Sequence, residues 1–151
     1  MIYNKEDFDT VKAFGEALSA TRDAVRHFVQ KRLKEQSIDL TFEMLEVMTI
    51  IFEKGKMNQQ EIANSLRKDK TSVTYLIDNL TKRGLVLRVG GNDDRRNKII
   101  HLTQNGEQLE SILSGIVKEF HKTAGKDLTP DYFKMLTQAL LKIKKNISVE
   151  E

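Results

Sequence analysis

Apolar residues recur at intervals of three and four over most of this 151-residue chain, which places them on one face of a helix. The spacing predicts a long helix from Phe8 to about Leu33. At about 1.5 Å per residue it would span roughly 39 Å, which is long for a domain of this size. We therefore expect its apolar side to pack partly against a second copy of the chain, with packing inside one copy as the alternative.

Two further helices are predicted before residue 68. The first begins after Thr41, is apolar around much of its circumference and ends at Gly55. The second is short and follows Asn58, which forms a capping-box pattern with Glu61. Both helices are expected to contribute to the core.

The stretch DKTSVTYLIDNL, residues 69–80, organises the rest of the prediction. Asp69 is suited to cap the helix, and Gly84 is typical of a Schellman ending. The apolar stripe consists of Val73, Leu76, Ile77 and Leu80, and the opposite face carries Lys70, Thr71, Thr74, Tyr75, Asp78 and Asn79. With the short helix before it, this stretch predicts a helix-turn-helix whose polar face suits a DNA major groove. An ordinary amphipathic surface helix would show the same pattern.

After Gly84 the period changes to two, which predicts a β-hairpin with strands at 85–89 and 98–102. Thr103 is expected to cap another long helix that Gly125 breaks, and Thr129 with Pro130 begins the last one. The predicted fold is mainly α with a small β-hairpin wing, that is, a winged helix-turn-helix. Its N- and C-terminal helices form a dimerisation region, because their apolar faces need a partner.

Charge is distributed unevenly along the chain. Residues 67–98 contain nine Lys or Arg against four acidic residues, whereas the remainder has sixteen against eighteen. A basic block in an otherwise slightly acidic chain is typical of a protein that binds a polyanion, although a solvated charged face is the simpler alternative.

Several other classes of protein are not supported. The chain has no cysteine, and its three histidines, His27, His101 and His121, are far apart, so that neither a disulfide nor a metal site is expected. We find no phosphate loop, nucleophile elbow or HExxH motif, and expect neither an enzyme nor a cofactor. No apolar run reaches membrane-spanning length and the first ten residues do not resemble a signal peptide, so no membrane partner and a cytoplasmic location are expected.

Three runs resemble the MarR family of bacterial transcriptional regulators in their order and spacing: MNQQEIANSL, DKTSVTYLIDNLTKRGLV and RVGGNDDRRNKIIHLTQNG. The wing signature consists of Asp94, Arg95, Arg96, Leu102, Thr103 and Gly106. One departure is the absence of glycine near Arg67, in the helix-turn-helix turn. The resemblance implies a single domain over 1–151, with a dimerisation region at about 1–36 and 104–147 and a DNA-binding lobe at about 40–103.

The resemblance also implies a function and the residues that perform it. Members of the family usually repress a palindromic operator as homodimers, and a small ligand relieves the repression. Thr74 and Tyr75 would contact bases, with Tyr75 replacing a frequent arginine, and Arg96 would enter the minor groove. The DNA-binding residues implied are Lys70, Thr71, Ser72, Thr74, Tyr75, Asn79, Arg88, Arg95, Arg96 and Lys98, with Asp94 bracing the wing.

A ligand pocket in this family lies between the dimerisation helices and the DNA-binding lobe. The residues that could line it by position are Arg26, His27, Phe28, Met48 and Phe52, although core or surface roles are the simpler reading. An amphipathic aromatic acid would suit this lining. The alternatives to a ligand-responsive repressor are a ligand-independent activator and a helical module that binds only proteins.

Overall fold

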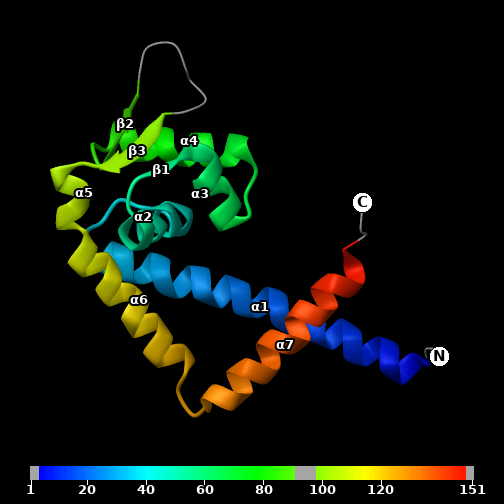
Figure 1. Cartoon of the computed structure of the whole chain (residues 1–151). Helices are drawn as coiled ribbons and strands as arrows, with labels where there is room; N and C mark the ends of the chain where they lie inside the picture. Colours follow the sequence, from blue (N-terminus) through cyan, green and yellow to red (C-terminus); the bar gives the residue numbers. More distant parts are fainter. Residues whose placement is uncertain (1–3, 91–97, 149–151) are drawn as a thin grey trace. The chain divides into compact units, whose positions relative to one another are not determined.

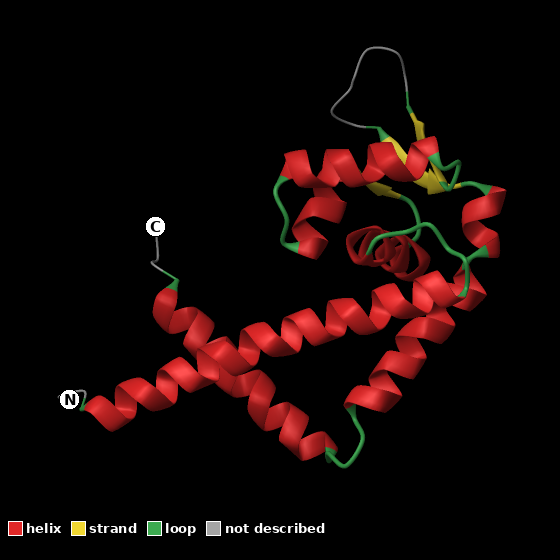
Figure 2. Ribbon diagram, turned by 180° about the vertical axis from the view of Figure 1, so that it is seen from behind, coloured by secondary structure: helices red, strands yellow, loops and turns green. Residues whose placement is uncertain are grey.

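The computed structural model describes residues 4–90 and 98–148, and within these ranges it has seven helices and three short strands (Figures 1 and 2). The elements in chain order are α1 (Lys5–Glu35), α2 (Phe42–Lys54), β1 (Met57–Asn58), α3 (Gln59–Leu66), α4 (Lys70–Lys82), β2 (Val86–Val89), β3 (Ile99–Leu102), α5 (Gln104–Gln108), α6 (Glu110–Ala124) and α7 (Pro130–Ile147). The prediction of a mainly helical protein with a small β-hairpin is confirmed.

Local capping interactions explain where the central helices begin and end. The Thr41 hydroxyl accepts a hydrogen bond from the backbone N–H of Met44 at the start of α2, and Gly55 ends that helix with a φ of 77°. Asn58 and Glu61 form the reciprocal capping box predicted for α3. Each cap satisfies N–H groups that have no partner within the helix.

The structure corrects the predicted elements in three places. The long helix expected after Thr103 is divided at Leu109, whose N–H bonds back to Gly106 in a tight turn. The apolar periodicity runs through both halves and does not reveal this break. Thr129 lies at the N-cap position of α7, but its side chain makes no capping hydrogen bond. The strand β1 was not predicted, because its two residues are too few to show an alternating pattern.

The three strands form one antiparallel sheet in the order β1-β3-β2. β2 and β3 pair from Val86 opposite Leu102 to Val89 opposite Ile99, which gives the predicted hairpin. β1 pairs with the other edge of β3 through Met57 and Asn58. This pairing attaches the start of α3 to the base of the hairpin.

The chain divides into two compact units, residues 1–118 and 119–151, and each is described by itself. The first unit contains a continuous hydrophobic core to which α1 to α4, the sheet and the first part of α6 all contribute. Its fully buried side chains include Leu33, Met48, Ile77, Ile100 and Leu113. This core holds the helix-turn-helix against α2 and the sheet.

Both terminal helices carry large apolar side chains on their surfaces. In α1 only Val29 and Leu33 are buried, whereas Phe8, Val11, Phe14 and Leu18 are 38–64% exposed. In the second unit, α7 has no buried residue, and its exposed apolar side chains include Tyr132, Phe133, Leu136, Leu140 and Ile143. Exposed apolar surface of this extent is typical of an interaction face.

Candidate nucleic-acid interface

α4 is held at its start by Asp69. The carboxylate of Asp69 accepts the backbone N–H of Ser72 at 2.8 Å and the hydroxyl of Ser72 at 2.6 Å. These two hydrogen bonds hold the pKa of Asp69 below its ordinary value, because they favour the charged carboxylate. The predicted N-cap is therefore confirmed, and the side chain of Ser72 serves that cap.

The turn between α3 and α4 is tight and positions α4 against α2. Arg67 adopts the left-handed conformation, with φ 52° and ψ 41°, at the place where glycine is common. Lys68 lies 3.3 Å from the carboxylate of Glu46 on α2. The turn therefore forms with arginine in place of glycine, and the ion pair of Lys68 with Glu46 links the turn to α2.

The end of α4 is joined to the base of the hairpin. The N–H of Leu85 bonds to the carbonyl of Leu80 and that of Gly84 to Thr81, which is the predicted Schellman pattern. Thr103 then donates its hydroxyl to the carbonyl of Gly84 and accepts the N–H of Gly106. A Cβ on Gly106 would lie 2.1 Å from the carbonyl oxygen of Leu85, so this close approach requires glycine.

The outer face of α4 has two kinds of polar side chain. Lys70, Thr71 and Tyr75 are exposed, and Tyr75 keeps 66% of its surface open to solvent. Thr74, by contrast, is half-buried and donates its hydroxyl to the carbonyl of Lys70 at 2.8 Å. It also accepts a hydrogen bond from the side-chain amide of Gln59 at the start of α3. The side chain of Tyr75 is thus exposed and able to contact DNA, whereas the hydroxyl of Thr74 is held by hydrogen bonds within the protein.

Other residues predicted to contact DNA make contacts within the protein. Asn79 donates its amide to the carbonyl of Tyr75 at 2.9 Å. Arg88 on β2 forms an ion pair with Asp78 on α4 at 2.6 Å, which joins the hairpin to α4. Lys98 is half-buried immediately before β3. Asp94, Arg95 and Arg96 lie outside the described residues.

The five residues predicted to line a ligand pocket have different environments. Arg26 pairs with Glu43 on α2 and lies over the ring of Phe42, while His27 is exposed. Met48 is fully buried, and Phe28 and Phe52 pack at the margin of the core. Burial raises the pKa of Glu43, but hydrogen bonds from its backbone and Arg26 outweigh burial and leave it lowered.

A cavity of about 630 Å³ lies between α2 and the start of α4. Its lining consists of Thr41, Glu43, Met44, Lys68, Thr71, Ser72, Tyr75 and Leu76. None of the five predicted ligand-binding residues belongs to this lining, although Glu43 connects it to Arg26. The cavity therefore borders the outer face of α4, and its lining carries one cation, Lys68, and one anion, Glu43.

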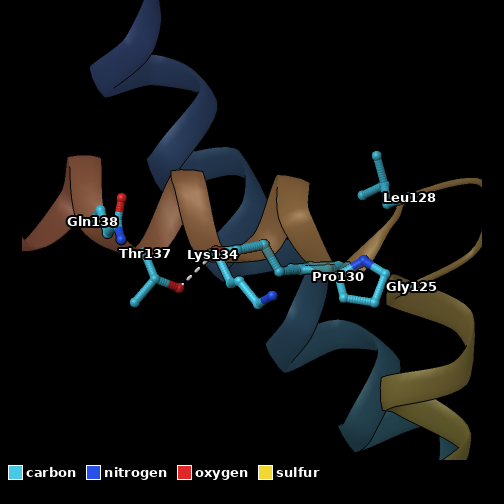
Figure 3. Close-up of a pocket in the computed structure, with 7 residues that line it drawn as sticks. Gly125, Leu128, Pro130, Lys134, Thr137 and Gln138 are labelled. Carbon is cyan, nitrogen blue, oxygen red and sulfur yellow. Dashed lines mark hydrogen bonds between the residues drawn. The ribbon is translucent and has the colours of Figure 1, made fainter.

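A second hollow, of about 730 Å³, lies wholly in the second unit at the start of α7 (Figure 3). Gly125, Leu128 and Pro130 lie at one end of it and Thr137 and Gln138 at the other. It shares no residue with α4 and belongs to the exposed apolar surface of α7.

Across the described parts of the chain, no three His, Asp or Glu side chains gather as a metal site. Within those parts, no helix has the length and apolarity needed to cross a membrane.

Two contacts at this surface were not predicted. Gln59 reaches Thr74 across 15 positions of sequence, and Asp78 reaches Arg88 across ten. Helical periodicity relates only residues three or four apart, so it gave no signal for either pair. The position of Gln59 directly after a capping residue was the one local indication that its backbone would be fixed.

Comparisons with known proteins agree with this geometry. Residues 40–98 match the model of the MarR family. A regulator from Bacillus subtilis, the HTH-type transcriptional regulator YfiV, is 26% identical over 84 residues, and the match spans 56% of this chain and about half of that protein. The HTH-type transcriptional regulator MgrA of Staphylococcus aureus is 26% identical over 125 residues, covering 83% of this chain and 82% of MgrA.

A solved structure extends the similarity to the fold. The MarR-family regulator from Listeria monocytogenes, solved in complex with a 26mer DNA, has a TM-score of 0.73 and 26% identity, with 87% of each chain covered.

The fold and the capped, outward-facing α4 define a winged helix-turn-helix protein. Residues 40–98 form a MarR-family domain, and the similarities together support a DNA-binding transcriptional regulator rather than an enzyme.

Proposed function

We propose that the chain is a homodimeric repressor that binds a palindromic operator, and that a small molecule relieves the repression. The observation that carries the proposal is α4, which is capped by Asp69 and exposes Lys70, Thr71 and Tyr75 on its outer face. The excess of positive charge in residues 67–98 supplies attraction to phosphates. A regulator acting on chromosomal DNA would work in the cytoplasm.

The exposed apolar side chains of α1 and α7 support the homodimer. A twofold dimer would cover these faces with their equivalents in the second copy. It would also present two α4 helices to half-sites about one helical turn apart, roughly 34–36 Å. A palindromic operator follows from that symmetry.

The proposed DNA contacts differ in kind. Tyr75 is the candidate for base contact on α4, and Lys70 and Thr71 are candidates for phosphate contacts. Arg96, with Arg95, remains the candidate for the minor groove. Arg88 is proposed to act through its ion pair with Asp78, which holds the hairpin against α4.

The decisive experiment is a binding titration with duplex DNA from upstream of the chain's own gene, over a series of salt concentrations. We expect binding at nanomolar to micromolar concentration, with log K falling by about 0.9 per phosphate contact for each decade of salt. A scrambled duplex of equal composition is the control. Equal affinity for both duplexes would contradict a specific regulator, and no binding to either would favour the module that binds only proteins.

The wing can be tested in the same assay. Arg96→Ala is expected to weaken operator binding, because it removes a cation that would contact the DNA. It should leave the dimer intact, because residue 96 is far in sequence from the apolar faces of α1 and α7. Parental affinity in this variant would exclude the proposed role of Arg96.

Relief by a small molecule is proposed to occur at the cavity between α2 and α4. A bound carboxylate would meet Lys68 beside Tyr75, and there it would share the ammonium group with Glu46. Calorimetric titration with salicylate tests this, followed by operator release at the same concentration. We expect Lys68→Ala to abolish the heat and His27→Ala to preserve it. The reverse result would favour the lining predicted from the sequence, and no heat in the parent would exclude a salicylate-like effector.

A further inference from the structure

The hydroxyl group of Thr74 has little hydrogen-bonding capacity left for DNA. It has one hydrogen and two lone pairs, and the hydrogen is donated to the carbonyl of Lys70 at 2.8 Å. One lone pair accepts an N–H from the amide of Gln59. What remains is a single acceptor position and the methyl group, which reads few bases by itself.

Gln59, in contrast, has a free donor and a free acceptor. Its amide carries two N–H groups and a carbonyl oxygen, and only one N–H is used by Thr74. Within residues 4–90 and 98–148, the second N–H and the carbonyl oxygen make no further hydrogen bond. An adjacent donor and acceptor on one planar amide match the N7 and N6 positions of adenine in the major groove.

The backbone of Gln59 is fixed from two directions. Asn58, the residue before it, caps α3 in a reciprocal capping box with Glu61. Asn58 also pairs with Ile99 in the sheet. The amide plane is then oriented by Thr74, so that the side chain is prearranged before any ligand arrives.

We propose that Gln59 determines specificity by reading an adenine in each operator half-site, and that Thr74 is the positioning residue that orients its amide. The inference rests on the proposed function, since it names a base contact of the same surface. It transfers the role predicted for Thr74 to a residue of the preceding helix. The competing explanation is that the bond between Gln59 and Thr74 only ties α3 to α4.

The test is selection of binding sites from a randomised duplex library by the full-length protein. The parent is expected to select adenine at one position of each half-site. Gln59→Ala should lose that preference by about 5- to 150-fold while the other positions keep theirs, as expected for the loss of one bidentate contact. Gln59→Glu should move the preference toward cytosine, because a carboxylate accepts from the cytosine N4 group.

Matched control variants distinguish a loss of base recognition from a loss of folded structure. Gln60→Ala removes the same side chain one position further on, where the amide bonds to Asn64 on the exposed side of α3, and should leave every preference unchanged. Thr74→Val removes the hydroxyl and should weaken the preference at the same base pair, whereas Thr74→Ser should retain it. Thermal unfolding of each variant reports any loss of structure.

The outcomes are distinguishable. If Gln59→Ala selects the same sequences as the parent, the inference is wrong. If Gln59→Ala weakens binding equally at all positions with a lower melting temperature, the bond is only structural and the inference is also wrong. If the parent selects no sequence at all, the proposed function fails, and this inference fails with it.

Discussion

The proposed DNA-binding lobe, from α2 to β3, buries most of its apolar residues, whereas much of α1 and all of α7 expose theirs. From α2 to β3, most apolar side chains are buried, and Val47, Ile62, Ile77 and Ile100 are 0% exposed. Leu87 and Val89 on β2 are the exceptions among the aliphatic side chains, at 38% and 46% exposed. In the first half of α1 and throughout α7, the apolar side chains lie at the surface of the single chain.

The contrast shows which part of the molecule is complete in one copy. The lobe satisfies its helix ends with its own caps, and it buries its apolar residues in a core completed within the same copy by the end of α1 and the first part of α6. The terminal helices have regular apolar stripes but too little surface of their own to cover them. We therefore expect changes in the lobe to act on stability and changes in the terminal helices to act on assembly.

The largest effect is expected from a charge in the apolar face of α7. Leu140→Asp should raise the dissociation constant of the proposed dimer at least a hundredfold, because a twofold interface loses two buried leucines at about 1.5–3 kcal/mol each. Light scattering at micromolar concentration should then report a mass near 17.4 kDa rather than twice that value.

Lys142→Asp is the control for Leu140→Asp, since it places the same charge on α7 at a position that is already polar. It should keep the dimer mass. A dimer that persists in Leu140→Asp would show that α7 is not the assembly face.

The next effect concerns the junction between α4, β2 and α5. Gly106→Ala should lower the free energy of unfolding by about 3 kcal/mol, because the new Cβ would have to displace the backbone of Leu85. Urea unfolding followed by circular dichroism measures this change. Gly115→Ala on α6 meets nothing within 4 Å and should be neutral or slightly stabilising, so equal losses in both variants would contradict the packing argument.

A smaller effect of opposite sign is expected in the helix-turn-helix turn. Arg67→Gly should raise the free energy of unfolding by about 1 kcal/mol, since it removes the steric cost of the left-handed conformation. Arg67→Ala retains the Cβ that causes this cost and should show no comparable gain. Urea midpoints for the two variants test the difference, and an equal gain in both would show that Arg67 is not strained.

The smallest effect is a pH dependence at Asp69. The pKa of Asp69 is lower in the folded chain than in the unfolded chain, where it is about 3.9. The charged carboxylate therefore contributes to stability above that pH, and the contribution is lost as the pH falls through the pKa of the folded chain. Asp69→Asn keeps the capping oxygen without titrating. The difference in unfolding midpoint between parent and variant should therefore narrow below about pH 4, and a constant difference down to pH 2 would contradict the assignment.

Sequence reasoning was most accurate where the interaction is local. Thr41, Asn58, Asp69 and Gly84 were each predicted to begin or end a helix, and each does so in the structure. These caps join groups about three to five positions apart, so the pattern of residues carries the information. The break at Leu109 was missed because the apolar periodicity continues through it.

Only the tertiary structure decided how the outer face of α4 is used. It bonded Thr74 to Gln59 and Arg88 to Asp78, and it brought Gly106 against the backbone of Leu85. These partners are ten or more positions apart, and their meeting depends on how the helices and strands pack around the core. The sequence by itself determined the helices, the strands and the fold class, because caps and periodicity act over a few residues. Long-range packing decided which side chains on the outer face of α4 remain available to bind DNA.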